Sequence, residues 1–220
     1  MARSRDPVAT REAILRAAEV LFAERGYDGA SMQDIASAAG VSRGMPGYAF
    51  GPKRELYEAV LTRAFAEPRA LASQLMASLG ADDPEAALRA AIEGYIDFLA
   101  QHPTYLRLLQ RAALDGGGEL GEAAASAEGL TDALPAADAL LKAAGFRAVD
   151  ARQLLVSAIA LCFFPFAHND TLLRPLGLDA EDPRFLAERK SHVVDLLLTG
   201  LGERAQGSAS PVRGAHRPRG

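Results

Sequence analysis

The chain has 220 residues, 49 % of them hydrophobic and 24 % charged, which is typical of a soluble globular protein with one large or two small domains. Its single cysteine excludes an internal disulfide framework and a multi-cysteine zinc site, and it suits a reducing cytoplasm. The net charge of −4 argues against a nucleic-acid partner, but residues 1–65 hold nine Lys and Arg against eight Asp and Glu and are weakly positive.

The first residues predict a short arm followed by a helix. Residues 1–9 have no apolar run of the kind that a signal peptide needs, and we expect them to be flexible. Thr10 suits the N-cap of a helix whose apolar stripe ends at Gly26. The most apolar run, residues 154–167, is shorter than the ~20 residues of a membrane span and contains Pro165, which favours a buried helix. We therefore expect a cytoplasmic protein with no membrane partner.

Residues 31–53 predict two short helices joined by a tight turn. Ser31 suits the N-cap of the first helix, and the apolar residues that follow it recur at helical spacing. Gly40 stands where a left-handed residue is needed, and Ser42 is placed to cap the second helix. Two helices joined by a short turn containing glycine form the helix-turn-helix plan, whose second helix enters the major groove of DNA.

The second of these helices, predicted over residues 43–48, is weak by propensity. It contains two glycines and Pro46, and a proline in a helix interior costs about 3 kcal/mol. Packing must therefore hold the helix in place, and the expected anchors are Val41, Tyr48 and Phe50.

Residues 10–57 contain three parts. They are the run T-R-E-A-I-L-R-A-A-E-V-L-F-A-E-R-G-Y, the helices and turn just described, and the run Y-A-F-G-P-K-R-E-L-Y. With this spacing the sequence resembles the TetR (tetracycline-repressor-like) family of bacterial transcriptional regulators. The rest of the chain matches that family in general plan and in its end, S-H-V-V-D-L-L-L-T-G-L. The resemblance implies an all-α fold of about nine helices, with an N-terminal three-helix helix-turn-helix domain and a larger C-terminal helical domain for ligand binding and dimerisation.

We predict three regions along the chain. Residues 1–58 form the DNA-binding domain, residues 59–202 the effector-binding and dimerisation domain, and residues 203–220 a disordered basic tail. A fourth helix links the two domains. The later helices are expected over residues 84–101, 105–114, 123–144, 151–164 and 184–201, with a flexible Gly-Gly-Gly joint at residues 116–118.

The resemblance also implies the residues that touch double-stranded DNA. Arg43 is suited to a phosphate or a guanine edge, Met45 to a thymine methyl, and Lys53 to a phosphate at a helix N-terminus. The full predicted set is Gln33, Ser42, Arg43, Gly44, Met45, Tyr48 and Lys53. The chain departs from the commoner family pattern at Met45, Gly47 and Ala49, and each departure removes a possible phosphate contact.

The C-terminal domain is expected to bind a small, largely apolar effector among its fourth to eighth helices. The predicted contacts are Tyr95, Phe98, Leu99, Tyr105, Leu109, Cys162, Phe163, Phe166 and His168. Each has an ordinary alternative: the aromatic residues and Cys162 suit a plain core, and His168 suits the end of a helix.

A homodimer is predicted through the last two helices. Their apolar residues are expected to form a four-helix bundle with a second copy, which places two recognition helices on a palindromic operator. The predicted seam is Leu154, Leu155, Ala158, Ile159 and Cys162, with Val193, Val194, Leu197, Leu198 and Leu201.

The function that we expect is that of a ligand-responsive DNA-binding regulator, most simply a repressor that its effector releases from the operator. A helical ligand-binding or protein-interaction module without specific DNA binding is the alternative. An enzyme is not expected, because the sequence shows no Ser-His-Asp order, paired carboxylates or Gly-rich nucleotide loop. The four histidines share no metal-like spacing, and we expect neither a metal nor a cofactor.

Overall fold

The computed structural model describes residues 6–66, 83–114 and 149–202, together with a few isolated positions between these ranges. Every regular element in these ranges is helical, which confirms the all-α fold class. The elements are α1 (Pro7–Gly29), α2 (Met32–Ala38), α3 (Met45–Phe50), α4 (Lys53–Ala64), α6 (Pro84–Gln101), α7 (Pro103–Leu114), α10 (Ala151–Ala167), the π turn η1 (Asn169–Leu173), the 3-10 turn η2 (Arg174–Leu176) and α11 (Pro183–Leu201).

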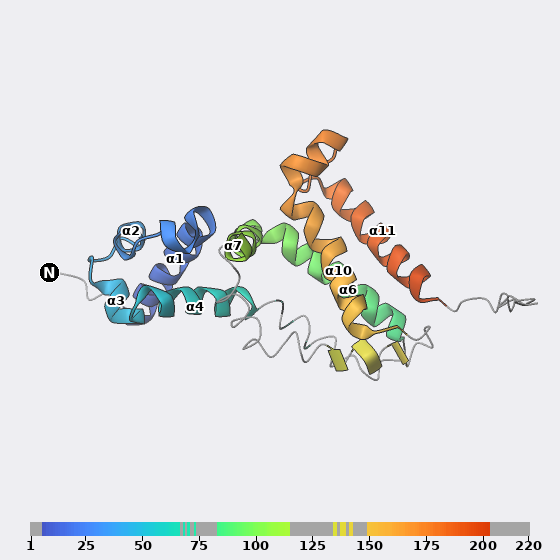
Figure 1. Cartoon of the computed structure of the whole chain (residues 1–220), viewed down its shortest axis with the longest axis horizontal. Helices are drawn as coiled ribbons and strands as arrows, with labels where there is room; N and C mark the ends of the chain where they lie inside the picture. The colour runs from blue at the N-terminus through green and yellow to red at the C-terminus, as the bar shows by residue number, and fades with distance from the viewer. Residues whose placement is uncertain are drawn as a thin grey trace, which may run out of the picture.

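Figure 1 shows two groups of helices with one helix between them. Helices α1 to α4 lie at one end, α6, α10 and α11 lie at the other, and α7 stands at the junction. Among the described residues no single helix is long and apolar enough to cross a membrane; α10 and the segment Asn169–Leu176 meet that test only as a pair bent by 78°.

Helix α1 begins earlier than the sequence predicted. Asp6 is its N-cap, and its Oδ1 accepts a hydrogen bond from the Val8 N–H at 2.9 Å. Pro7 follows in the first turn, where its missing N–H costs nothing. The predicted start at Thr10 is therefore wrong, and only residues 1–5 of the predicted arm remain outside the described structure.

Helices α6 and α10 begin where acidic caps predict them, whereas α7 begins at Pro103, two residues before its predicted start. Asp83 accepts from Ala86 N–H at 2.9 Å, and Asp150 accepts from Arg152 N–H at the same distance. Asp182 caps α11, which starts one residue before the prediction. Helix α10 continues past the predicted end at residue 164 to Ala167. The helix predicted over residues 123–144 and the glycine joint at 116–118 fall outside the described ranges.

Two apolar cores lie on either side of the junction. The first is built by α1, α2 and α4 and contains the fully buried side chains Ile14, Phe22, Ile35, Leu56 and Leu61. The second is built by α6, α10 and α11, with Ile96, Leu99, Val193 and Val194 at its centre. Helix α7 contributes to both cores: Leu108 is fully buried in the first, whereas Tyr105 and Leu106 belong to the second.

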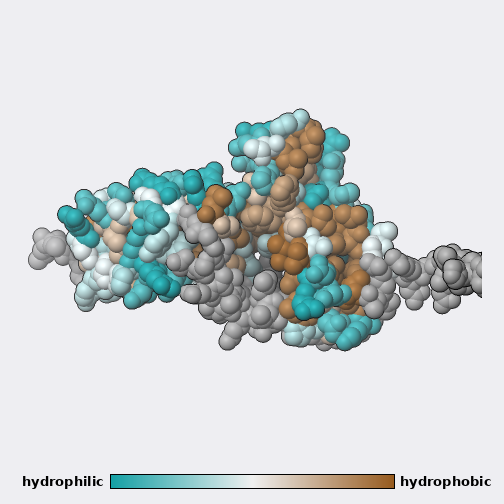
Figure 2. All heavy atoms as spheres, in the orientation of Figure 1, coloured by the Kyte–Doolittle hydropathy of each residue, from teal (hydrophilic) through white to brown (hydrophobic). Residues whose placement is uncertain are grey.

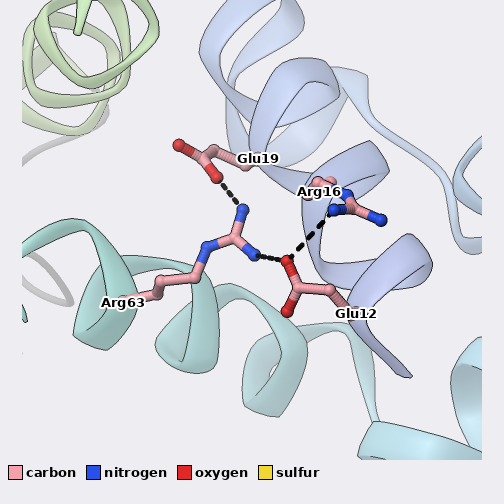
Figure 3. A network of polar contacts seen from close by, with 4 residues as sticks. All are labelled: Glu12, Arg16, Glu19 and Arg63. Carbon is pink, nitrogen blue, oxygen red and sulfur yellow. Dashed lines mark hydrogen bonds and ion pairs between the residues drawn. The ribbon is translucent and has the colours of Figure 1, made fainter. Parts of the chain in front are cut away.

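Polar contacts fasten α4 to α1 at the edge of the first core (Figure 3). The Arg63 guanidinium reaches Glu12 Oε1 at 2.8 Å with one nitrogen and Glu19 with the other. Arg16 adds a longer contact of 3.8 Å to Glu12. Because the Arg63 side chain is largely covered, this network holds the end of α4 more firmly than an exposed ion pair does.

Candidate functional site

The turn between α2 and α3 has the predicted geometry. Ser31 caps α2, since its Oγ accepts from the Asp34 N–H at 3.1 Å and donates to Asp34 Oδ2 at 2.7 Å. The bond from Ser31 lowers the pKa of the Asp34 carboxyl below its ordinary value. Gly40 has φ +64°, the left-handed conformation that favours glycine, and the Val41 N–H returns to the Ala36 carbonyl at 3.0 Å.

Helix α3 differs from its prediction in where it begins. It runs Met45–Phe50, so Arg43 and Gly44 lie in the preceding turn, and Ser42 offers its backbone carbonyl to the Met45 N–H at 2.9 Å without a side-chain cap. Pro46 is therefore in the first turn, where no helical hydrogen bond is lost. The expected cost of an interior proline is wrong for this residue.

The first helix holds α3 in place. Arg11 of α1 donates to the Ala49 carbonyl near the end of α3, and its guanidinium carbon lies 3.8 Å from the centre of the Phe50 ring. Phe50 and Val41 pack on the first core as expected. Tyr48 does not, because 89 % of it is exposed, so its prediction as an anchor is wrong.

The predicted DNA-binding residues divide by exposure. Arg43 and Tyr48 are exposed, together with Gln33, Ser42 and Gly44. Met45 packs against the first core and is half-buried, which leaves less of it for a thymine methyl. Lys53 stands at the N-terminus of α4 with Nζ 4.4 Å from the centre of the Tyr27 ring. The exposed set lies along the turn and α3, as an interface with DNA requires.

The predicted effector residues gather in the second core, with one exception. Buried there are Phe98, Leu99, Tyr105, Cys162 and Phe166, and Tyr95, Leu109 and Phe163 pack against them. His168 lies instead at the C-terminus of α10, with its ring 4.2 Å from that of Phe164 and Nδ1 3.3 Å from the Thr171 hydroxyl. Its surroundings are those of a residue at a helix end.

The second core contains ionisable groups as well as apolar ones. The rings of Tyr95 and Tyr105 lie 6.3 Å and 4.9 Å from that of Phe98, and burial raises the pKa of both phenols, that of Tyr105 to about 12. Burial also raises the pKa of the Cys162 thiol to about 12. These groups stay neutral in the folded protein at physiological pH, so they can orient a ligand without carrying charge.

Sequence reasoning missed Arg189. It lies on α11 in line with Phe185, Val193, Leu197 and Leu201, which are all buried. This four-residue spacing is visible in the sequence, and a cation inside such an apolar row was the signal that could have revealed it.

The Arg189 guanidinium has one unusual bond and one unsatisfied nitrogen. Pro165 has no N–H to offer the Leu161 carbonyl inside α10, and Arg189 Nη2 donates to that carbonyl at 2.5 Å. Arg189 Nε is buried and has no hydrogen-bond partner within the part of the chain that the structure describes. Burial lowers the pKa of the guanidinium, although a group with so high an ordinary value keeps its proton. The neighbouring Lys190, by contrast, pairs with Asp97 at 2.5 Å.

Five residues of the predicted dimer seam are buried within this chain and are not available to a second copy: Val193, Val194, Leu197, Leu201 and Cys162. The other five are half-buried, namely Leu154, Leu155, Ala158, Ile159 and Leu198, and a seam through α10 and α11 stays a prediction. The apolar residues that remain at the surface are Val156 at 63 % exposure and Phe164 at 52 % on α10, and Leu196 at 49 % on α11. Figure 2 shows hydrophobic residues gathered over this half of the molecule, whereas the helix-turn-helix half is mainly hydrophilic.

Helix α7 connects the two halves by hydrogen bonds as well as by packing. Arg111 Nη2 donates to the Glu24 carbonyl of α1 at 3.2 Å, and Gln110 Nε2 donates to the Ala167 carbonyl of α10 at 2.9 Å. A groove of about 430 Å³ runs along this junction, lined by Ala23, Glu24, Arg107, Gln110, Arg111 and Leu114. Helix α7 is therefore bonded to both halves of the molecule.

No group of three or more His, Cys, Asp or Glu side chains in the described ranges is arranged to hold a metal ion.

Comparisons with known proteins agree with this arrangement. The family model of bacterial regulatory proteins of the tetR family matches residues 14–60, and that of the tetracyclin repressor-like C-terminal domain matches residues 84–197. The HTH-type transcriptional repressor NicS of Pseudomonas putida is 28 % identical over 199 residues, which are 87 % of this chain and 92 % of the relative. The HTH-type transcriptional activator FasR of Mycolicibacterium smegmatis is 31 % identical over 152 residues, 69 % of this chain and 68 % of the relative.

Solved structures show the same fold. A TetR-family transcriptional regulator from Mesorhizobium loti superposes with a TM-score of 0.65 at 22 % identity, covering 91 % of this chain and 100 % of its own. The regulator FadR from Bacillus subtilis, in complex with stearoyl-CoA, has a TM-score of 0.65 at 17 % identity and covers 86 % of this chain and 98 % of its own. The chain belongs to the TetR family of bacterial regulatory proteins and is a DNA-binding transcriptional regulator.

Proposed function

We propose that this regulator is a repressor that binds a palindromic operator as a homodimer and leaves it when a small effector occupies the second core. One observation carries the DNA-binding part: α3 and the turn before it expose Arg43 and Tyr48, while Arg11 and Phe50 fix the helix from behind. A helix held on one face and exposed on the other is what entry into a major groove requires.

Each exposed residue then has a role on DNA. Arg43 and Lys53 neutralise phosphates, and Tyr48 touches the backbone beside them. Ser42 and Gly44 add contacts in the turn, where short side chains and backbone N–H groups approach the phosphates closely, and Gln33 adds one from the first turn of α2. Met45 contributes its exposed part to a base edge. The division of the chain near residue 58 remains a prediction, and the first core continues to Leu61 of α4.

The dimer forms through the surface of α10 and α11. Val156, Phe164 and Leu196 are exposed apolar residues that a second copy covers. Two copies related by a two-fold axis set their recognition helices about 34–36 Å apart, one helical turn of DNA, or at a multiple of that spacing. A regulator that works in this way acts in the cytoplasm, beside the DNA that it binds.

The effector is an organic molecule with a substantial apolar part. The predicted contacts around Phe98, Cys162 and Phe166 supply apolar surface, and the Tyr95 and Tyr105 hydroxyls supply orientation. Helix α7 transmits occupancy of this region, because Leu108 is buried in the first core while Tyr105 belongs to the second. A hundredfold loss of operator affinity requires ~2.7 kcal/mol of coupling.

The decisive experiment is DNA binding. The protein is titrated against the DNA that flanks its own coding region and against a scrambled duplex, at several salt concentrations. Specific binding to the flanking DNA supports the proposal, and equal affinity for both duplexes contradicts it.

Single substitutions locate the interface. Lys53→Ala weakens all sequences alike and reduces the slope of log affinity against log salt by about 1, and Arg43→Ala does the same or relaxes specificity at one base pair. Arg184→Ala is the matched control, because Arg184 is an exposed cation on α11 and pairs with Glu188. A slope that is unchanged by both interface substitutions contradicts the assignment.

A further inference from the structure

We propose that the effector carries an oxyanion, such as a carboxylate or a phosphate, and that the half-buried Arg189 binds it at the edge of the second core. This inference rests on the proposed effector-binding role of that core and adds the chemical class of the ligand: an amphiphile with one anionic head group and an apolar body.

The position of Arg189 is the first argument. It is the charged member of an α11 row whose other members, Phe185, Val193, Leu197 and Leu201, are buried. Taking a cation out of water costs free energy unless an anion or several acceptors compensate it. No carboxylate in the described ranges pairs with Arg189, although Lys190, one position along, pairs with Asp97 at 2.5 Å.

The bond from Arg189 to the Leu161 carbonyl uses only one of its N–H groups. Its Nη2 satisfies the Leu161 carbonyl that Pro165 frees, which accounts for one of five N–H groups. Its Nε is buried and has no hydrogen-bond partner among the described residues. Leaving a buried donor without a partner is costly, and an oxyanion would satisfy it while neutralising the charge.

Its neighbours suit the same ligand. Cys162 on α10 and Tyr105 on α7 are buried in this core, and Tyr95 on α6 packs against it. The rings of Tyr95 and Tyr105 lie 6.3 Å and 4.9 Å from that of Phe98. Three helices thus each bring one polar group to an otherwise apolar core, and Arg189 of α11 lies beside it through its bond to Leu161, which suits a polar head group with an apolar body.

The test uses three probes of one chain length: decanoate, decyl phosphate and decan-1-ol. Binding to the full chain is measured by isothermal titration calorimetry below the concentration at which the probes form micelles. At least one anion should bind at least about tenfold more tightly than the alcohol, and the better anion identifies the head group. Equal affinities for all three, or no measurable binding of either anion, would overturn the proposal.

Variants separate ligand binding from the structural role of the same side chain. Arg189→Gln keeps one donor for the Leu161 carbonyl and removes the charge, and it should lose the preference for the anion. Lys190→Gln removes the adjacent cation and should keep that preference. The double variant Pro165→Ala/Arg189→Gln restores an N–H for the Leu161 carbonyl and should still fail to bind the anion; recovery of binding there would show that Arg189 serves only the helix. If Arg189→Gln alone does not fold, the double variant takes its place, and anion affinity equal to that of the wild type would overturn the proposal.

DNA binding is followed in parallel without any probe. Wild-type protein and Arg189→Gln should bind the operator alike. Absence of specific DNA binding by the wild type would contradict the proposed function. The calorimetric preference for the anion tests the role of Arg189 independently of that result.

Discussion

The two halves of the molecule keep their charged side chains in different places. In the first core the members are apolar or aromatic, and the charged groups nearest to it, Arg63, Glu12 and Glu19, pair with one another at its edge. In the second half the half-buried Arg189 stands in an otherwise buried row of α11 and bonds the Leu161 carbonyl instead of a carboxylate. Charge near the first core is thus compensated by ion pairs, whereas Arg189 has no carboxylate partner in the described ranges, and the proposed effector site rests on this difference.

The largest expected effect concerns the neighbouring residues Leu196 and Leu197. Leu197→Glu places a carboxylate in the second core and should unfold that half, because an unpaired buried charge costs several kcal/mol. Leu196→Glu alters an exposed residue and should leave the helical content unchanged while dissociating the dimer. Circular dichroism and sedimentation velocity measure the two outcomes. A folded Leu197→Glu, or a Leu196→Glu that remains dimeric at micromolar concentration, would contradict the division into buried and exposed faces.

Leu108 tests whether the halves are independent. It is fully buried in the first core although it belongs to α7, so Leu108→Ala should destabilise the protein by about 2–5 kcal/mol through the cavity that it leaves. Leu109→Ala, a half-buried neighbour that packs on the second core, is the matched control and should cost less. Urea unfolding measures both. Equal losses would mean that α7 is not inserted between the two cores as described.

The bond between Arg189 and the Leu161 carbonyl can be measured by a double-mutant cycle. Arg189→Gln should lower the free energy of unfolding by about 1–3 kcal/mol in the wild-type background, because the carbonyl freed by Pro165 loses a charged donor. In the Pro165→Ala background that carbonyl has a helical partner again, so the loss should be smaller. Identical losses in both backgrounds would show that the bond does not depend on the proline.

The smallest expected effect lies in the recognition unit. Ser31→Ala removes the cap of α2 and should cost about 1 kcal/mol, whereas Ser37→Ala removes an exposed bond to the Gln33 carbonyl within the helix and should cost little. Thermal unfolding of the two variants gives the difference. If Ser37→Ala proves as costly as Ser31→Ala, capping is not what fixes this helix.

Local signals predicted much of the fold. Ser31, Asp83 and Asp150 start helices because their side chains satisfy backbone N–H groups within three residues, which needs no tertiary information. Asp6 preceded Thr10 with the same chemistry and the added advantage of Pro7, and it was overlooked. The start of α3 was also misplaced, because Arg43 and Gly44 form a turn rather than the first helical residues.

The site was harder to predict than the fold. Apolar residues at helical spacing on α11 suit a dimer seam and an internal core equally well, so the pattern of Val193 and Leu197 did not say which one they form. The exposure of Tyr48 depends on how α3 packs on α1. Arg11 of α1 contacts Ala49 and Phe50 of α3, and these contacts join residues that are distant in sequence. The spacing of apolar residues predicts that Arg189 lies on the buried side of its helix. Its bond to the Leu161 carbonyl could not be predicted, because it joins two helices.

The ion-pair network around Arg63 couples the orientation of α4 to that of α1. Arg63 forms ion pairs with Glu12 and Glu19, so a rotation of the end of α4 is coupled to α1. Arg11 of α1 in turn donates a hydrogen bond to α3, which couples α3 to the same rotation. A helix of the length of α4 extends about 18 Å, so a tilt of roughly 10° at one end displaces the other by about 3 Å. A displacement of that size exceeds the tolerance of a hydrogen bond to a phosphate. Under the proposed function, a small rotation of α4 near the junction would therefore alter the contacts with the operator, because ion pairs couple α4 to α1 and Arg11 couples α1 to α3.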